Sequence, residues 1–324
     1  MIHGYCGPAC SRWLLMCTLA FGPAAALAGP YGFITNQKAN TVSVVDTATQ
    51  SVIRTIPVGK EPAGVAVSPD GARIVVTNPG GKSITVIDGG RLEPIGDLPV
   101  GEGPLGVAVS PDGRLAYVAD WYENQITVID LQERKPVKQI PVGRSPSGVV
   151  VSADGRRLFV ANRDDDSVVT MDAGTGDGPR TVKVGKHPFG MTLNRAGTRL
   201  YVANVESNDV SVVDTERMAV LRTVQVGDRP YAVALAADER RAFVTNQYDN
   251  TASVLDAESG AVIATVAVGE YPEGVAASSD GQRVYVANWF GNSLTVINAL
   301  TLAVENTIRT GDGSRAFGAF VAQR

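Results

Sequence analysis

Short apolar runs separated by turn residues dominate this chain, and they recur with a period of 42 residues. In the unit 104–143, Pro111-Asp112-Gly113 is typical of a tight turn, because proline presets φ and glycine tolerates positive φ. The run Ile126–Asp130 alternates between apolar and polar residues as a half-buried strand does. The unit predicts four short strands, at 106–110, 115–119, 126–130 and 137–142, with the first innermost and the fourth outermost.

Seven copies of this unit follow one another without an insertion or deletion across three repeated columns. The columns are Asn36, Asn78, Asp120, Asn162, Asn204, Asn246 and Asn288; Asp46, Asp88, Asp130, Asp172, Asp214, Asp256 and Asn298; and Gly59, Gly101, Gly143, Gly185, Gly227, Gly269 and Gly311. Such a period predicts an all-β, seven-bladed β-propeller with four-stranded antiparallel blades. The chain enters the repeat at a second strand (31–35) and ends on a first strand (317–321). We therefore expect the C-terminal strand to complete the N-terminal blade and close the ring.

Residues 1–28 are predicted to be a cleaved signal peptide, and residues 29–324 a single propeller domain. Arg12 precedes the apolar run 13–21, which is too short to span a bilayer, and Ala26-Leu27-Ala28 is typical of a cleavage site. No later run is long enough to cross a membrane, so we expect a soluble periplasmic or secreted protein without membrane insertion. All three cysteines precede Gly29, which excludes thiol catalysis and cysteine-ligated metals in the mature chain.

Four strand sequences resemble one known repeat. They are Tyr117-Val118-Ala119-Asp120, Tyr201-Val202-Ala203-Asn204, Phe243-Val244-Thr245-Asn246 and Tyr285-Val286-Ala287-Asn288, and they resemble the YVTN repeat. The flanking Pro-x-Gly-Val-Ala-Val-Ser-Pro-Asp-Gly segments resemble it too. The chain is thus similar to bacterial YVTN-family propellers, including exported YncE-like proteins. The resemblance implies the propeller fold. It leaves function open, because the family includes DNA-binding, surface-layer, adhesive and quinoprotein-associated members.

Function is expected where the repeats differ, because a residue repeated in every blade stabilises each blade. We expect an Asx-turn at the repeated Asn and Asp columns. The crossing between blades and the hairpin after the second strand should share one variable face, whereas turns such as Asp112-Gly113 lie on the other.

The candidate ligand-binding residues on the variable face are Trp121, Tyr122, Arg144, Arg163, His187, Phe189, Arg229, Tyr231, Tyr248, Tyr271, Trp289 and Phe290. Basic and aromatic groups around one mouth suit a glycan, a nucleotide, a cofactor or single-stranded DNA. Alternatively, the aromatic side chains simply cover neighbouring hairpins.

His187 is the sole histidine after residue 28. A multi-histidine metal site is therefore excluded, and a Ser–His catalytic pair could form only at His187. The run Asp164-Asp165-Asp166 lacks the alternating ligands of a calcium loop. These carboxylates are instead candidate partners for Arg163, Lys186 or Arg229, which would make the sector less basic. The sequence therefore predicts no metal site and assigns no catalytic residue.

The leading functional hypothesis is a non-enzymatic binding or interaction protein without a cofactor, whose partner is a small molecule, a glycan or a periplasmic protein. The alternative is an enzyme or enzyme-accessory propeller, associated with quinone-cofactor, haem d1, lactonase or lyase chemistry, in which His187, Arg229, Tyr231 and Tyr271 would act. A third reading is weak single-stranded DNA binding. The mature chain would carry 28 basic and 33 acidic residues, and this net charge of −5 argues against strong nonspecific binding to DNA. A purely structural role at the cell surface is a fourth.

Overall fold

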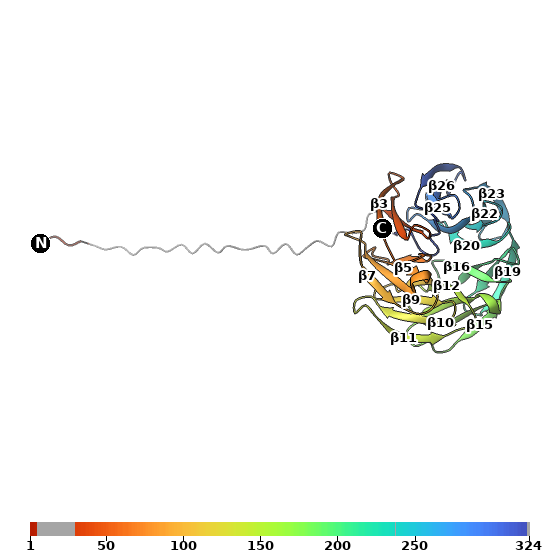
Figure 1. Cartoon of the computed structure of the whole chain (residues 1–324), viewed down its shortest axis with the longest axis horizontal. Coiled ribbons are helices and arrows are strands. Elements are labelled where there is room, and N and C mark those ends of the chain that lie inside the picture. The colour runs from red at the N-terminus through yellow and green to blue at the C-terminus, as the bar shows by residue number, and fades with distance from the viewer. Residues whose placement is uncertain (5–29, 237, 323–324) are drawn as a thin grey trace.

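Seven β-sheets form a ring around a central axis in the computed structural model, which describes residues 1–4, 30–236 and 238–322 (Figure 1). The predicted signal peptide lies almost entirely outside the described residues. Blades 1 to 3 contain β1 (Tyr31–Asn36), β2 (Thr41–Asp46) and β3 (Ser51–Pro57); β4 (Val65–Val67), β5 (Arg73–Asn78), β6 (Ser83–Asp88) and β7 (Glu93–Pro99); and β8 (Pro104–Val109), β9 (Leu115–Asp120), β10 (Gln125–Asp130) and β11 (Lys135–Pro141).

Blades 4 to 7 repeat this arrangement around the rest of the ring. They contain β12 (Pro146–Val151), β13 (Arg157–Asn162), β14 (Ser167–Asp172) and β15 (Arg180–Lys183); β16 (Pro188–Leu193), β17 (Arg199–Asn204), β18 (Asp209–Asp214) and β19 (Ala219–Gln225); β20 (Pro230–Leu235), β21 (Arg241–Asn246), β22 (Thr251–Asp256) and β23 (Val262–Ala267); and β24 (Pro272–Ala277), β25 (Arg283–Asn288), β26 (Ser293–Asn298) and β27 (Val304–Arg309). Two 3₁₀ turns, η1 (Pro79–Gly81) and η2 (Arg163–Asp165), lie in hairpins after second strands. The predicted seven-bladed, antiparallel all-β fold is confirmed.

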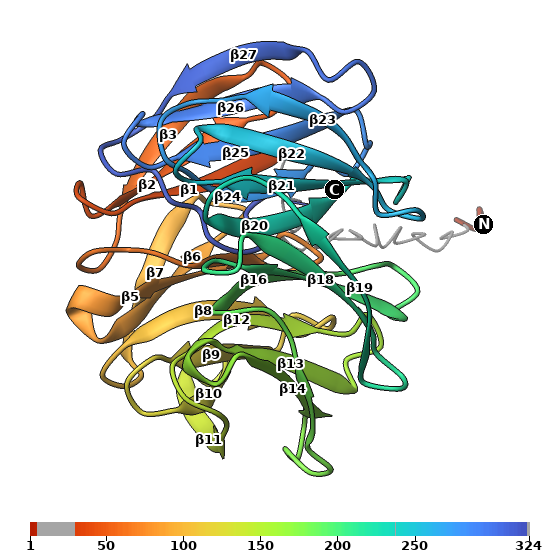
Figure 2. The ribbon, with the colours of Figure 1, turned by 90° about the vertical axis from the view of Figure 1, so that its right-hand side faces the viewer.

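The first strand of each blade lies nearest the axis, and neighbouring first strands such as β8 and β12 contact one another. Their small side chains, including Ala108 and Ala234, line a central channel of about 520 Å³. Second and third strands are almost wholly buried between blades, whereas the fourth strands are largely exposed to solvent. Figure 2 shows the disc from its side, with the blades stacked around the ring. Among the described residues, no helix is long and apolar enough to cross a membrane.

The C-terminal segment closes the ring, but it does so through isolated bridges rather than a regular strand. The Arg315 N–H donates to Thr35 O (2.9 Å) and the Phe33 N–H to Phe320 O (2.8 Å), which joins the segment to blade 1. The Val65 N–H donates to Phe317 O (2.8 Å), so the same segment also bonds to blade 2. Gly318, at φ 119°, provides the bend that this double pairing requires. The prediction that the C-terminus completes the first blade is therefore confirmed, with irregular pairing in place of the expected strand.

The repeated Asn and Asp column is structural. Asp120 forms the expected Asx-turn, with Oδ1 accepting from the Tyr122 and Glu123 N–H groups, whereas Asn36 has a different geometry. Asn36 Nδ2 donates to Thr41 Oγ1 (3.0 Å) and Ser43 Oγ (2.9 Å), and the Gly311 N–H donates to Asn36 Oδ1 (3.1 Å). A Cβ on Gly311 would lie 2.5 Å from Asn36 Cγ, so this glycine makes room for the asparagine. The Asn and Gly columns are thus two halves of one contact between adjacent blades. The Asp46 column does form the expected turns, with Asp46 Oδ1 accepting from two following N–H groups.

Candidate binding face of the ring

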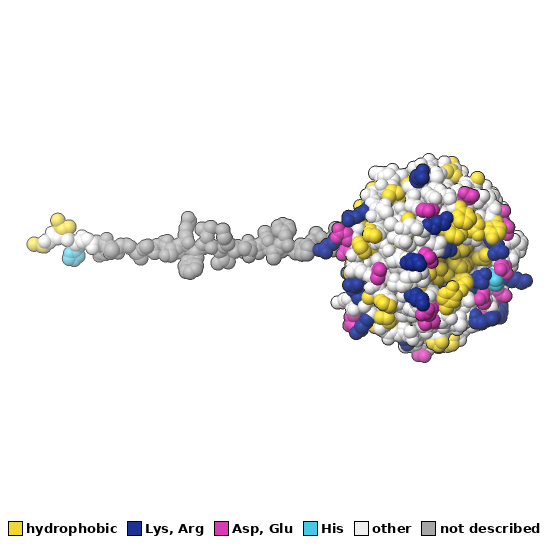
Figure 3. Space-filling view, viewed as in Figure 1, with side chains coloured by type: hydrophobic (Ala, Val, Ile, Leu, Met, Phe, Trp, Pro, Cys, Tyr) yellow, Lys and Arg dark blue, Asp and Glu magenta, His cyan; other side chains and the backbone are white. Residues whose placement is uncertain are grey.

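Crossings between blades and hairpins after second strands meet on one face of the disc, which we call the loop face. The Trp289 N–H donates to Tyr271 O (2.9 Å), and the Val205 N–H donates to His187 O (3.0 Å). Each bond ties a hairpin to the crossing beside it. The expected grouping of these two loops on one face is therefore present, and Figure 3 views the disc from this face.

The residue before the first strand is held in a left-handed backbone conformation in most blades. His187 has φ 54° and Tyr271 has φ 57°, and their N–H groups donate to Asp166 Oδ1 (2.9 Å) and Asn250 Oδ1 (2.8 Å). Equivalent bonds join Ser145 to Asn124, Arg229 to Asn208 and Gly313 to Asn292. Left-handed backbone is unfavourable for bulky residues, so the scaffold imposes it on these side chains. Their directions are consequently fixed before any ligand arrives.

A ring of seven positions surrounds the axis on the loop face, one from the start of each first strand. Its members are Ala63, Leu105, Ser147, Phe189, Tyr231, Glu273 and Arg315, each 42 residues after the last. The scaffold around them repeats, yet the residue differs in every blade. Phe189 and Tyr231 were predicted as site residues, whereas Glu273 and Arg315 were missed. The sequence signal that could have found them is this column itself. It is the single position between the proline and the glycine that recur in most blades, and its residue type changes from blade to blade.

Glu273 and Arg315 form a buried ion pair beside the axis. Arg315 Nε donates to Glu273 Oε2 (2.5 Å) and Nη2 donates to the Tyr231 hydroxyl oxygen (2.7 Å), while Gln247 Nε2 donates to Glu273 Oε1 (2.9 Å). The Glu273 side chain is 1% exposed. Burial raises the pKa of Glu273, an effect that Arg315 opposes, and burial also raises the pKa of Tyr231. The carboxylate is therefore engaged by protein donors and is inaccessible to a reacting substrate.

Aromatic side chains close the loop-face end of the central channel. The ring centroids of Phe189 lie 4.2 Å from Tyr231, 4.8 Å from Phe317 and 6.3 Å from Trp121. Phe189, Tyr231 and Phe317 are buried, and Trp121 is half-buried. Hydrophobic side chains accordingly gather near the centre of the loop face, with charged side chains around them (Figure 3). Phe189, Tyr231 and Trp121 thus form a floor around the axis, and Phe317 is a member that the sequence did not reveal.

A second aromatic group, which we call the aromatic platform, consists of Tyr248, Tyr271, Trp289 and Phe290. The Tyr271 ring lies 5.5 Å from Tyr248, 5.5 Å from Trp289 and 4.7 Å from Phe290, and the last two stack at 4.5 Å. Tyr248 is 53% and Phe290 45% exposed. Burial and the neighbouring Tyr248 raise the pKa of Tyr271 to about 12, so its hydroxyl is protonated at neutral pH.

Cations flank the platform. Arg229 lies over the Tyr248 ring at 5.0 Å, and Lys38 lies over Phe290 at 5.4 Å. Arg315 lies over the Trp289 ring at 5.2 Å and so connects the platform with the buried pair. The Trp289 Nε1 atom is buried and has no hydrogen-bond partner among the described residues. Four predicted aromatic residues and Arg229 are therefore brought together by three consecutive blades.

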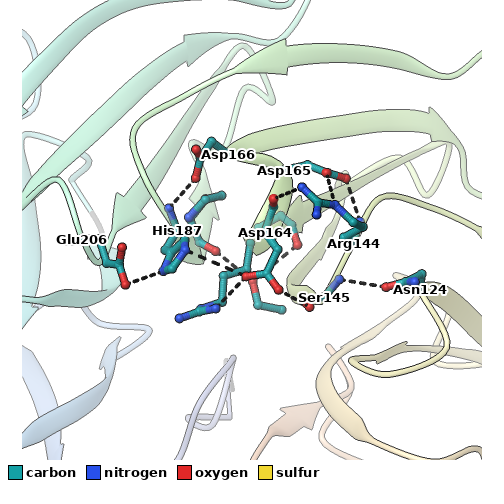
Figure 4. A network of polar contacts seen from close by, with 12 residues as sticks. Asn124, Arg144, Ser145, Asp164, Asp165, Asp166, His187 and Glu206 are labelled. Carbon is teal, nitrogen blue, oxygen red and sulfur yellow. Dashed lines mark hydrogen bonds and ion pairs between the residues drawn. The ribbon is translucent and has the colours of Figure 1, made fainter.

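The predicted basic sector is neutralised by its own acidic run. Figure 4 shows the network, in which Arg144 Nε donates to Asp165 Oδ1 (2.7 Å) and Arg163 Nη1 to Asp164 Oδ1 (2.6 Å). Backbone and side-chain donors of Arg144 lower the pKa of Asp165. Arg144 and Arg163 are therefore paired with Asp165 and Asp164, which makes the sector less basic than a count of its arginines and lysines suggests. No group of three potential metal ligands occurs within the described ranges.

His187 belongs to the same network. Its Nδ1 lies 2.8 Å from Glu206 Oε1 and its Nε2 lies 3.9 Å from Asp164 Oδ1 (Figure 4). The Nδ1 atom is buried and has no hydrogen-bond partner of suitable geometry among the described residues, so its contact with Glu206 is a close approach rather than a hydrogen bond. Tyr122 lies apart from both aromatic groups and is 72% exposed. The predicted residues therefore divide into a central floor, the platform, a charged network and one isolated tyrosine.

Fold and loop face together define a seven-bladed β-propeller whose blade-specific residues meet at one end of the ring. Residues 97–225 match the profile of the family described as "Lactonase, 7-bladed beta-propeller". A search of curated proteins found no match.

Solved structures share the architecture. A chain of Kuenenia stuttgartiensis hydrazine synthase is 25% identical, with a TM-score of 0.75, covering 88% of this chain and 99% of that one. A functionally unknown protein from Desulfotomaculum acetoxidans DSM 771 is 15% identical, with a TM-score of 0.77 and coverage of 90% and 100%. Dihydro-heme d1 dehydrogenase NirN in complex with DHE is 16% identical, with a TM-score of 0.67 and coverage of 91% and 66%. The chain is thus similar to lactonase-type propellers over its middle section and shares its fold with propellers found in enzymes.

Proposed function

We propose that this chain is an exported binding propeller of the YVTN type, which engages a ligand or a protein partner through its loop face. The observation that carries the proposal is the aromatic platform. Its four rings lie on consecutive hairpins and crossings, and two of them are about half exposed. An exposed aromatic cluster is costly to leave in water and is typical of a recognition surface.

The scaffold supports the same proposal. Tyr271 adopts φ 57°, whereas the equivalent residue of the closing segment is Gly313, which fits a left-handed conformation without strain. A tyrosine at this position therefore serves the surface rather than the backbone.

The experiment compares the native mass spectrum of protein purified from its own host with that of a Phe290→Ala variant. A bound molecule that is present on the first and lost from the second supports the proposal. N-terminal sequencing of the same sample tests export, since a mature chain beginning at Gly29 is expected. Retention of the molecule by Phe290→Ala would move the binding site away from the platform.

An enzyme or enzyme-accessory role is the second candidate, favoured by the lactonase-profile match over residues 97–225 and by similarity to a hydrazine synthase chain. Glu273 argues for the accessory form, because its buried carboxylate is engaged by Arg315 and Gln247. Lactone hydrolysis by the wild type that disappears in Glu273→Gln would instead favour catalysis. An absorption band beyond the aromatic range in the purified protein would favour a cofactor.

A further inference from the structure

The platform's geometry limits the shape of what it binds. Neighbouring ring centroids are 4.5 to 5.5 Å apart, so the rings contact one another and leave no space for a group between them. An aromatic cage around a methylated ammonium requires the opposite arrangement, with rings surrounding an open centre. A ligand must therefore lie across the platform and present a flat face to it.

Charge limits the ligand further. The ring faces that would attract a cation are already covered at both ends, by Arg229 over Tyr248 and by Lys38 over Phe290. A cationic ligand would displace or repel these side chains.

Polyanions are disfavoured as well. The loop segments around the platform carry three basic residues against five acidic ones, namely Arg229, Lys38 and Arg315 against Asp228, Asp249, Glu270, Glu273 and Asp312. Lys38 Nζ also lies 4.0 Å from Asp312 Oδ1. Binding of single-stranded nucleic acid combines stacking with a positively charged groove along the phosphates, and this surface has only the stacking part.

From this geometry, and resting on the proposed function, we propose that the aromatic platform binds an uncharged glycan, with the C–H face of a hexose lying beside Tyr271 and displacing the exposed Lys38 ammonium from the Phe290 face. The negative faces of aromatic rings attract the weakly positive C–H bonds of a sugar. Tyr248 and Tyr271 provide hydroxyl groups beside the rings, and the exposed Glu270 provides a carboxylate for sugar hydroxyls. The platform is preformed because the Tyr271 backbone is bonded on both sides, to Asn250 and to Trp289.

The test titrates the full mature chain with cellohexaose and chitohexaose, and with oligothymidylate as the polyanionic comparator, and follows tryptophan fluorescence and calorimetry. Tyr248→Ala and Phe290→Ala remove exposed rings, so both variants should fold with unchanged melting temperatures. Tyr122→Ala is the matched control, because Tyr122 occupies the equivalent hairpin position and is exposed but lies outside the platform.

We expect an uncharged oligosaccharide to bind with little dependence on salt, and each platform variant to weaken it about tenfold while Tyr122→Ala does not. Tighter binding of oligothymidylate than of either oligosaccharide would overturn the glycan proposal. A host-derived ligand or protein that Phe290→Ala releases, without any oligosaccharide binding, would overturn the glycan class and leave the proposed function standing. If Phe290→Ala changes the binding of no oligosaccharide, host-derived ligand or protein, both the glycan proposal and the proposed function are refuted.

Discussion

Replacing Arg315 by methionine should destabilise the ring far more than an ordinary loop substitution. Arg315 bonds to both Glu273 carboxylate oxygens and to the Tyr231 hydroxyl, and Glu273 is 1% exposed. Methionine matches the aliphatic stem of arginine but leaves the carboxylate buried with Gln247 as its remaining side-chain donor. Breaking a buried pair in this way costs about 3–5 kcal/mol, because one charge remains desolvated.

The loss should depend on pH, with a sign that follows from Glu273. Burial already raises the pKa of this carboxyl in the wild type, and removal of Arg315 takes away the main opposing charge. The folded variant should therefore bind a proton that the unfolded chain, with a glutamate pKa of about 4.3, has lost. A native state that binds more protons loses stability as pH rises, by up to about 1.4 kcal/mol per pH unit until the folded pKa is passed. Arg315→Met should thus be closer to wild type at pH 5 than at pH 8.

Guanidinium unfolding followed by tryptophan fluorescence at pH 5 and pH 8 measures both effects. The double variant Glu273→Gln/Arg315→Met removes the titrating group and should lose the additional pH dependence. Arg144→Met, which removes an exposed arginine paired with Asp165, should leave the unfolding midpoint unchanged. A loss below about 1 kcal/mol for Arg315→Met, or an equal loss at both pH values, would refute the reasoning about a buried, unpaired carboxylate.

Three further changes test other parts of the ring. Gly311→Ala should lower stability by about 1–3 kcal/mol in thermal or denaturant unfolding, because its Cβ would collide with the buried Asn36; unchanged stability would contradict the Asn–Gly contact. Tyr271→Gly should lower the melting temperature only modestly, because relief of a positive φ offsets part of the lost ring packing, yet it should abolish platform binding, and retained binding would count against the platform. His187→Gln should retain platform binding, since the imidazole lies in the charged network beside Glu206 and Asp164 rather than in the aromatic platform, and a complete loss would place the histidine in the binding site.

Much of the architecture could be predicted from the repeat alone, because a fixed period with four strand patterns allows few arrangements. The period also places the crossing and hairpin loops on one face, and with them Tyr271 and Trp289. The structural role of the Asn column was harder to predict from the sequence. Asn36 bonds to hydroxyls on β2 and accepts from Gly311 in another blade, and this contact depends on side-chain geometry across the ring closure. Local turn chemistry, the basis of the sequence prediction, does not contain that information.

The buried pair shows both what an internal repeat can reveal and what is easily missed. Glu273 and Arg315 are separated by 42 residues, so they occupy the same position in adjacent sectors of the ring, and opposite charges at such positions can meet. A basic and aromatic count directed attention instead to Arg144 and Arg163, whose charges are neutralised by Asp165 and Asp164. The sequence already indicated that the acidic run 164–166 would partner Arg163; Arg163 pairs within its own hairpin, whereas Arg144 pairs from the adjoining crossing. In a ring of repeats, the informative comparison is between equivalent positions of neighbouring blades, since these are the residues that the fold brings into contact.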